Sequence, residues 1–415
     1  MNMFASRTNW TLAPNRLSRH LEERRGLGLS FLDLTESNPT RCGFCFDQPA
    51  ILEALGDPHS LVYEPEPRGL LRARQAVVNY YAERGADVGP KQIFLTTSTS
   101  EAYSYVFRLL ADPGDAILAP RPSYPLFDFL TRLNDVELIH YPLVYRPLLD
   151  DQGWRIDLPA LESTLRSSTR RMRAILAVHP NNPTGSFVRP PELDSLLDLC
   201  RSHRLALITD EVFSDYLLPA RPAAATKVAA SDEWRVARPA SHAAASRALT
   251  FTLSGLSKIS ALPQMKLAWM VVNGPPDDLA AALARLEVIA DTYLAVSTPL
   301  QHALPKLLEL RRQMQPQILT RLRQNLVWLD DRFSSGSPVS RLRSEGGWYV
   351  ILRLPSVKSD EDWAIELLDR AGVLVHPGHF YDFTSEGHLV VSLLPTREVF
   401  QEGLEKILAY VEQSA

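Results

Sequence analysis

Cysteine is scarce in this 415-residue sequence, which contains only Cys42, Cys45 and Cys200. A low and odd number of cysteines is typical of a reducing compartment. Cys42 and Cys45 form a C-x-x-C motif, but no second pair lies nearby and no βαβ pattern surrounds them. We therefore interpret them as two partly buried thiols of a loop rather than as a redox pair or half of a metal site, and we expect no metal centre.

Long apolar runs and an excess of basic charge are also missing. No run of about 18 uncharged apolar residues occurs, and the N-terminus, MNMFASRTNWTLAPNR, lacks the apolar region of a signal peptide. The net charge of −4 argues against a nucleic-acid-binding surface. Neither a G-x-G-x-x-G nor a Walker-type loop is present, which argues against a nucleotide-dependent enzyme. We expect a cytoplasmic protein that binds neither nucleic acid nor membrane.

Short apolar runs alternate with helix-like stretches through the first two thirds of the chain. The predicted strands are 92–98, 115–124, 136–144, 172–180 and 204–212, and the helices between them include 71–85, 100–111 and 190–204. This alternation is typical of a mostly parallel sheet with helices on both faces. The segment 219–248, rich in Ala, Pro and Arg, is predicted to be a long surface excursion.

The last third of the chain has a different pattern. A long helical region runs to about residue 333 and is interrupted by Pro299, Pro305 and Pro316; strand-like segments and two more helices follow. A chain of 415 residues is too long for one core of average size. We predict a large domain and a smaller α+β domain, formed respectively by residues 46–290 and by residues 1–45 with 291–415.

Polar residues gather where the predicted strands end. Asp210 and Glu211 end a strand in ITDEVFSDY, and HPNNPTG (179–185) follows another strand. TTSTSEAY (96–103) joins a strand to a helix through four consecutive hydroxyl residues, Thr97 to Ser100. Each could be a plain turn or a helix cap. Ligands of open α/β sheets, however, bind at the carboxyl ends of strands, and a hydroxyl-rich helix start is an anion site.

Lys258 lies in the small and apolar stretch SGLSKISALPQMKLAWM (254–270). Burying an ammonium group without a partner is costly. Such a lysine either extends its amine to water or loses the ammonium charge because its amine is covalently bound to another group.

NNPTG, DEVFSDY and GLSK, taken in this order, resemble the class I and II aminotransferases, which are fold-type I enzymes that use pyridoxal 5′-phosphate (PLP). The resemblance runs from about Leu32 to the C-terminus. It implies the PLP-transferase fold, with a mostly parallel, seven-stranded-type sheet between helices and a smaller α+β domain. It also implies a homodimer with shared active sites that moves an amino group between an amino acid, or a related amine, and a 2-oxo acid.

The same resemblance implies a role for each matching residue. Lys258 would form the Schiff base with the cofactor and carry the proton, Asp210 would pair with the pyridinium nitrogen, and Tyr124 would stack on the ring; these three are the expected catalytic residues. Asn182 would donate to the phenolic oxygen beside the substrate. The phosphate would be held by Ser98, Thr99, Ser100, Ser254, Ser257 and Lys266, and by Tyr63 across the dimer interface.

Four positions depart from the family pattern. Phe213 replaces a tyrosine, which removes a donor to the phenolic oxygen and is expected to raise the pKa of the Schiff base. Lys266 replaces a phosphate-binding arginine and lacks its two-pronged guanidinium. Gly255 replaces a common serine. Val390, in HLVVSLL, stands where an arginine would bind the substrate carboxylate, a contact that valine cannot make.

Because Val390 cannot bind a carboxylate, the class of substrate is left undecided. Either another arginine binds the carboxylate, with Arg41 and Arg68 as candidates, or the substrate is not an ordinary α-amino acid. Each of these arginines could equally be a solvated loop residue. Tyr381 and Phe380 are expected to line the substrate pocket.

Two alternatives to an aminotransferase use the same fold. A PLP-dependent lyase or decarboxylase would need the same Lys258, Asp210 and Asn182. A PLP-binding regulatory module would need a DNA-binding segment ahead of the fold, and only about 30 residues precede Leu32.

Overall fold

The computed structural model describes residues 3–147, 153–218, 239–333 and 337–414. Its largest element is an eight-stranded sheet with the order β2-β9-β8-β7-β6-β3-β4-β5. In this order the strands are Ile93–Thr96, Ala268–Asn273, Thr250–Gly255, Ala206–Asp210, Met172–Val178, Ala116–Arg121, Glu137–Arg146 and Gly153–Ile156. The five from β8 to β4 are parallel, whereas β9 and β5 run antiparallel to their neighbours. The predicted mostly parallel sheet is confirmed.

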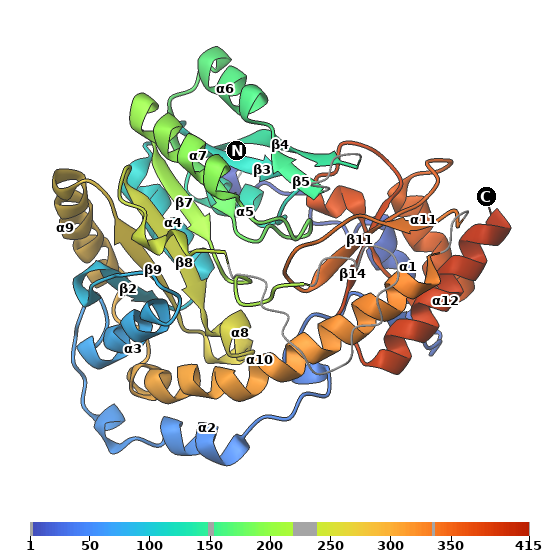
Figure 1. Cartoon of the computed structure of the whole chain (residues 1–415), viewed down its shortest axis with the longest axis horizontal. Helices are drawn as coiled ribbons and strands as arrows, with labels where there is room; N and C mark the ends of the chain where they lie inside the picture. Colours follow the sequence, from blue (N-terminus) through green and yellow to red (C-terminus); the bar gives the residue numbers. More distant parts are fainter. Residues whose placement is uncertain (1–2, 148–152, 219–238, 334–336, 415) are drawn as a thin grey trace.

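Helices cover both faces of this sheet (Figure 1). On one face α4 (Thr99–Leu110), α5 (Phe127–Leu133) and α9 (Pro276–Tyr293) pack in one apolar cluster, and on the other α6 (Leu158–Ser167) and α7 (Pro190–His203) pack in another. Successive side chains of a strand point to opposite faces, so Ile117 joins the first cluster and Leu118 the second. Burial of both faces explains why the strands read as continuous apolar runs.

A smaller antiparallel sheet carries the end of the chain, in the order β10-β11-β14-β13. Its strands are Ser340–Arg341, Tyr349–Arg353, His388–Ser392 and His376–Pro377. A short parallel pair joins β1 (Leu32–Asp33) to β12 (Val373–Leu374), which brings the N-terminal part of the chain to this sheet. Around them lie α1 (Arg16–Gly26), α11 (Asp360–Glu366), a π-helical turn (Leu367–Ala371) and α12 (Arg397–Ser414).

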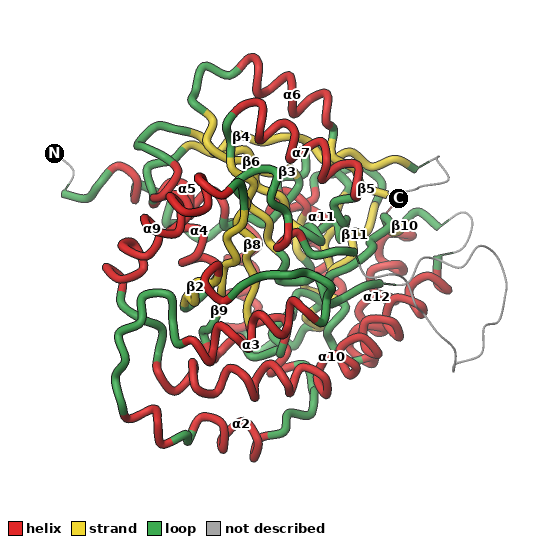
Figure 2. The backbone as a smooth tube through the Cα atoms, turned by 60° about the vertical axis from the view of Figure 1, so that its left-hand side comes forward, coloured by secondary structure: helices red, strands yellow, loops and turns green. Residues whose placement is uncertain are grey.

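One long helix, α10 (Thr298–Arg332), runs beneath both sheets (Figure 1). Together with α2 (Gln48–Leu55) and α3 (Leu71–Ala82) it forms one side of the molecule (Figure 2). The prediction that Pro305 and Pro316 interrupt this region was wrong, because both lie inside α10. Proline removes a helical hydrogen bond, and here the buried apolar side of the helix outweighs that loss.

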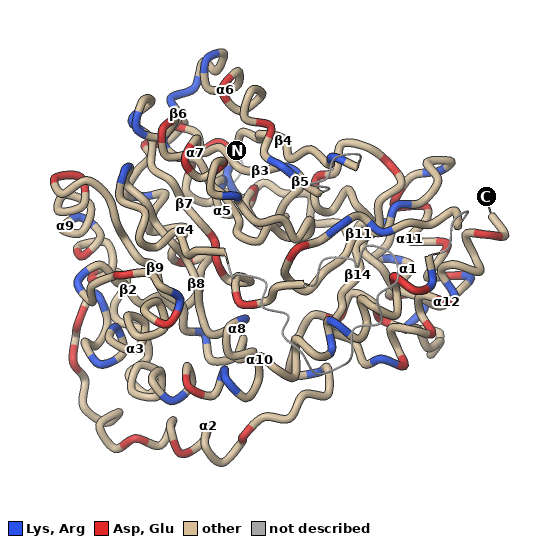
Figure 3. The backbone as a smooth tube through the Cα atoms, in the orientation of Figure 1, with Lys and Arg blue, Asp and Glu red and all other residues tan. Residues whose placement is uncertain are grey.

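Charge is mixed over the chain. Basic and acidic residues are both spread over the molecule (Figure 3), in keeping with the net charge of −4. Most of the predicted excursion, residues 219–238, lies outside the described residues, and its end forms the short 3-10 turn His242–Ala244. Among the helices that the structure describes, none is both long and apolar enough to cross a membrane.

Candidate active site

The polar strand ends meet at one edge of the large sheet. Val178, the last residue of β6, pairs with Asp210, the last residue of β7, and Asp210 pairs with Leu253 of β8. HPNNPTG therefore begins beside Asp210, and the N–H of His179 donates to the Asp210 carbonyl at 2.8 Å. The short helix α8 (Leu256–Ile259), which carries Lys258, follows β8 directly. Parallel pairing thus brings three motifs that are distant in sequence to one place.

Aromatic side chains surround the Lys258 amine. Its Nζ lies 4.8 Å from the ring centroid of Trp348 and 5.4 Å from that of Phe213. Burial lowers the pKa of Lys258 to about 8, although the Asp210 charge opposes this. The backbone is held as well, because the Tyr216 hydroxyl donates to the Lys258 carbonyl at 2.6 Å. A fixed amine with a lowered pKa is suited to act as a nucleophile and a base.

Asp210 is a buried carboxyl group with two donors. The Tyr103 hydroxyl donates to Oδ2 at 2.9 Å and the Val212 N–H donates to Oδ1 at 3.0 Å. Burial still raises the pKa of Asp210 to about 6. A positively charged ligand group beside this carboxylate would therefore be stabilised. Tyr103 was missed from the sequence; it stands in the quoted stretch TTSTSEAY, one turn inside α4.

Two neighbouring asparagines in the loop after β6 make different contacts. The Asn181 side chain accepts from the Ser123 hydroxyl at 2.8 Å and donates to the Pro122 carbonyl at 3.0 Å, so it holds the loop in place. The Asn182 side chain is also buried, but its Oδ1 has no hydrogen-bond partner among the described residues. A buried amide of this kind is free to bind a ligand.

Glycine is required at two positions close to these strand ends. Gly185 has a φ of 68°, and a Cβ there would lie 2.6 Å from the Gly346 carbonyl oxygen. A Cβ on Gly255 would lie 2.8 Å from the Cβ of Ala268 in β9. This contact gives the physical reason why glycine stands at residue 255, where the resemblance suggested serine.

The predicted phosphate-binding residues surround the start of α4 and the end of β8. Ser98 caps α4 through the Glu101 N–H at 3.1 Å, while the Glu101 carboxylate accepts from the Thr97 N–H at 2.7 Å. The Ser254 hydroxyl is buried and has no hydrogen-bond partner in the part of the chain that the structure describes. Thr99, Ser100 and Ser257 are half-buried in the first turns of α4 and α8. An N-terminal helix turn with hydroxyl groups is suited to an anion.

The other predicted cofactor residues are more exposed. Tyr124 is 38% exposed and its ring meets Phe127 edge-on at 5.8 Å. Lys266 is exposed and has a left-handed backbone just after Pro263–Met265. Tyr63 is 65% exposed, in a stretch where the side chains of Leu61 and Val62 are also exposed.

The two candidate arginines differ in their surroundings. Arg68 donates to Glu287 at 2.6 Å and to the Lys91 carbonyl at 2.6 Å, so its guanidinium is already bound. Arg41 is exposed at the end of the short turn Pro39–Arg41.

Val390 is 1% exposed. It packs with Ile351 and Tyr381 in the apolar cluster between the two sheets. Tyr381 donates to or accepts from His376 at 3.1 Å, whereas Phe380 packs partly buried against the same cluster.

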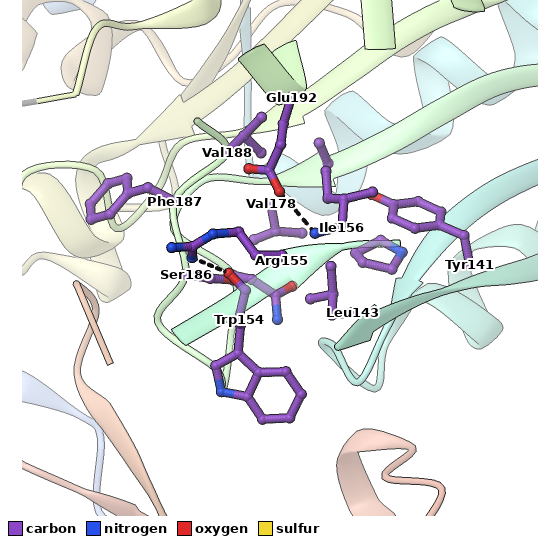
Figure 4. Close-up of a pocket in the computed structure, with 13 residues that line it drawn as sticks. Tyr141, Leu143, Trp154, Arg155, Ile156, Val178, Ser186, Phe187, Val188 and Glu192 are labelled. Atoms are coloured by element: carbon purple, nitrogen blue, oxygen red, sulfur yellow. Dashed lines mark hydrogen bonds between the residues drawn. The ribbon is translucent and has the colours of Figure 1, made fainter. Parts of the chain in front are cut away.

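A small cavity behind the Asn181 loop is not a substrate site. Its volume is about 10 Å³, the space of one water molecule. Figure 4 shows the Glu192 carboxylate accepting from the Ile156 N–H and Arg155 donating to the Trp154 carbonyl, at 2.9 and 2.6 Å. The contact between Ile156 and Glu192 joins β5 to α7, whereas the contact between Arg155 and Trp154 lies within β5.

Comparison with known proteins identifies the family. The family Aminotransferase class I and II matches residues 45–407, so the chain belongs to that family. It is 27% identical to the alanine aminotransferase of Mycobacterium tuberculosis (strain H37Rv) over 405 residues, 94% of this chain and 87% of that protein. It is 25% identical to the glutamate-pyruvate aminotransferase AlaA of Haemophilus influenzae over 392 residues, 92% and 91% of the two chains.

A solved structure shows the same fold. The alanine aminotransferase from Pyrococcus furiosus, at 21% identity, superposes with a TM-score of 0.82 over 99% of this chain and 100% of that one. The predicted fold type and the predicted aminotransferase activity are confirmed, and the family is one that uses PLP.

Proposed function

We propose that this aminotransferase binds PLP between Lys258, Asp210 and Asn182. The observation that carries the proposal is a pair of buried oxygens, Asn182 Oδ1 and Ser254 Oγ, at the strand ends that also bear Lys258. Neither oxygen has a hydrogen-bond partner among the residues that the structure describes. Native proteins seldom leave such atoms without partners. The Asn182 amide and the Ser254 hydroxyl, together with the Asp210 carboxylate and the Lys258 amine, match the polar groups of PLP.

The protein residues have separate tasks in this proposal. When bound, PLP supplies an electron sink for the negative charge that develops at the α-carbon of the donor. Lys258 holds the cofactor and then moves the proton at that carbon, for which its lowered pKa is suited. Asp210 places a negative charge at the ring nitrogen, and Tyr103 orients Asp210. Phe213 and Trp348 exclude water from the amine.

Binding of the phosphate would use the start of α4 and the end of β8. The N–H groups and hydroxyls of this region offer donors, and Lys266 offers a charge. The proposed donors are Ser98, Thr99, Ser100, Ser254 and Ser257. Tyr124 would cover the ring face. The partner subunit's Tyr63 would complete the site in a homodimer, which the exposed apolar side chains of Leu61 and Val62 support.

For the substrates we propose an amino acid or related amine as donor and a 2-oxo acid as acceptor. L-Alanine is the first donor to test, because the relatives named above are alanine and glutamate-pyruvate aminotransferases. Val390 is buried in an apolar cluster and offers no charge to a carboxylate. The exposed Arg41 is the better of the two candidate arginines, because Arg68 is bound to Glu287.

The proposal includes two further expectations, on the domain division and on the location. We retain residues 46–290 as the large domain and residues 1–45 with 291–415 as the small one, a division that would place Lys258 and Val390 on opposite sides of the substrate. We also retain a reducing cytoplasm as the location, which suits three free cysteines.

Transfer of the amino group is the experiment that tests the function. PLP-loaded protein is mixed with L-alanine or another donor and with an isotope-labelled 2-oxo acid, and the labelled amino acid is measured by mass spectrometry. Wild type and Lys306→Ala, a change in an exposed ion pair with Glu309, should form product, whereas Lys258→Ala should not. Release of ammonia or carbon dioxide without labelled amino acid would instead indicate a lyase or decarboxylase.

A further inference from the structure

Three metal-ligating side chains from distant parts of the chain meet beside the site. Asp128 lies in the first turn of α5, His140 lies in β4, and Asp382 follows the short turn Gly378–Tyr381. One ligand atom of each lies within 4.8 Å of those of the other two. Figure 1 shows α5 and β4 as neighbours at this edge of the large sheet.

The protein itself does not satisfy these groups. Among the described residues, no hydrogen bond or ion pair engages the side chains of Asp128, His140 or Asp382, and His140 Nδ1 is buried without a partner. Arg121 lies nearby, but its Nε donates to the backbone carbonyl of Asp382 at 2.9 Å, and among the described residues no ion pair joins it to either carboxylate. Two carboxylates and an imidazole thus lie close together, and among the described residues no cationic side chain pairs with them.

Electrostatics agrees with this geometry. Burial and the neighbouring Asp382 charge raise the pKa of Asp128, although His140 and Arg121 lower it. Like charges that approach one another in a protein are normally separated by a cation or share a proton.

We propose that Asp128, His140 and Asp382 bind one divalent transition-metal ion of the Zn²⁺ class, with water completing its coordination. Zn²⁺ and related ions accept imidazole and carboxylate ligands together. Mg²⁺ and Ca²⁺ prefer sites made of oxygen ligands alone. The three ligand atoms, which lie within 4.8 Å of one another, are close enough for small side-chain rotations to bring them to one ion.

The position of this site gives the ion a role. Asp128 follows the segment that carries Tyr124, and Asp382 is the residue after Tyr381. These segments already touch, because the Ser123 N–H donates to the Tyr381 carbonyl at 3.0 Å. A bound ion would fix the two tyrosine-bearing segments relative to each other across the two sheets. It would therefore stabilise the fold and adjust substrate binding without taking part in the reaction.

Isothermal titration of the metal-stripped full chain with Zn²⁺ tests the proposal, with Mg²⁺ as the comparison ion. Wild type should bind one Zn²⁺ per chain, and Asp382→Asn and His140→Gln should each weaken binding about tenfold or more. Asp369→Asn is the matched control, because Asp369 pairs with His20 at 2.8 Å on the surface and its change should leave binding intact. Cys45→Ser controls for binding by an exposed thiol.

A second measurement guards against misfolded variants. Zn²⁺ should raise the thermal unfolding midpoint of wild type, Asp369→Asn and Cys45→Ser, but not that of Asp128→Asn or Asp382→Asn, whose metal-free midpoints should match wild type. No Zn²⁺ binding by wild type, or equal binding by wild type and Asp382→Asn, would overturn the proposal. Neither result depends on aminotransferase activity, so the function and the metal site can fail separately.

Discussion

Replacing Tyr103 by phenylalanine removes the hydroxyl that donates to Asp210 at 2.9 Å. Burial raises the pKa of Asp210 to about 6 even though this hydrogen bond lowers it. A hydrogen bond to a charged group contributes about 1.5–3 kcal/mol, and about 1.4 kcal/mol corresponds to one pH unit. The pKa of Asp210 in Tyr103→Phe should therefore rise by about one to two pH units.

The affinity for PLP reports this change. Under our proposal the ionised Asp210 binds the ring nitrogen, so affinity should fall as the pH drops through the pKa of that carboxyl. The dissociation constant of PLP is measured on the cofactor-free protein by fluorescence quenching. As the pH is lowered, it should begin to rise at about pH 6 in wild type and one to two pH units higher in Tyr103→Phe.

Tyr105→Phe is the control, because Tyr105 lies on the same helix and its ring packs against Tyr293 at 5.3 Å. It should keep the pH dependence of wild type. Identical pH profiles for Tyr103→Phe and wild type would refute the argument that Tyr103 sets the charge of Asp210.

Three further results follow from the same contacts. As the pH is raised from about 8 to 10.5, the unfolding free energy of cofactor-free wild type should increase by about 3 kcal/mol relative to that of Lys258→Met, because only the unfolded chain keeps that lysine protonated in this range. If urea unfolding gave a constant difference between the two proteins at every pH, that result would contradict this. Gly185→Ala should lose about 1–3 kcal/mol more than Gly114→Ala, since both glycines have a positive φ but only Gly185 meets a neighbouring carbonyl; equal losses in urea unfolding would exclude the clash. In PLP-loaded protein Phe213→Tyr should lower the pH at which the visible absorbance titrates, through its added donor, and an unchanged titration would reject that role for residue 213.

The strands of the large sheet could be predicted because both of their faces are buried, which leaves unmistakable apolar runs. Asp210 and Lys258 could be placed from sequence because each lies within a short motif at a strand end. Parallel pairing then brings them together, as the register of Val178, Asp210 and Leu253 shows.

Contacts between distant segments could not be predicted in this way. Tyr103 reaches Asp210 only because α4 packs on the sheet against β8 and β9, and no local pattern marks that contact. The continuity of α10 through Pro305 and Pro316 depends on its buried neighbours. Asp128, His140 and Asp382 come from three elements, so no ligand spacing appears in the sequence, and we had expected no metal centre.

The attachment of PLP to Lys258 is the central claim, and chemical trapping tests it most directly. The protein is incubated with PLP, reduced with borohydride, digested and analysed by mass spectrometry. The account predicts that the peptide containing Lys258 carries the mass of reduced cofactor, one label per chain, and that Lys258→Ala carries none. A label on Lys266 or another lysine, or no label in wild type, would contradict it.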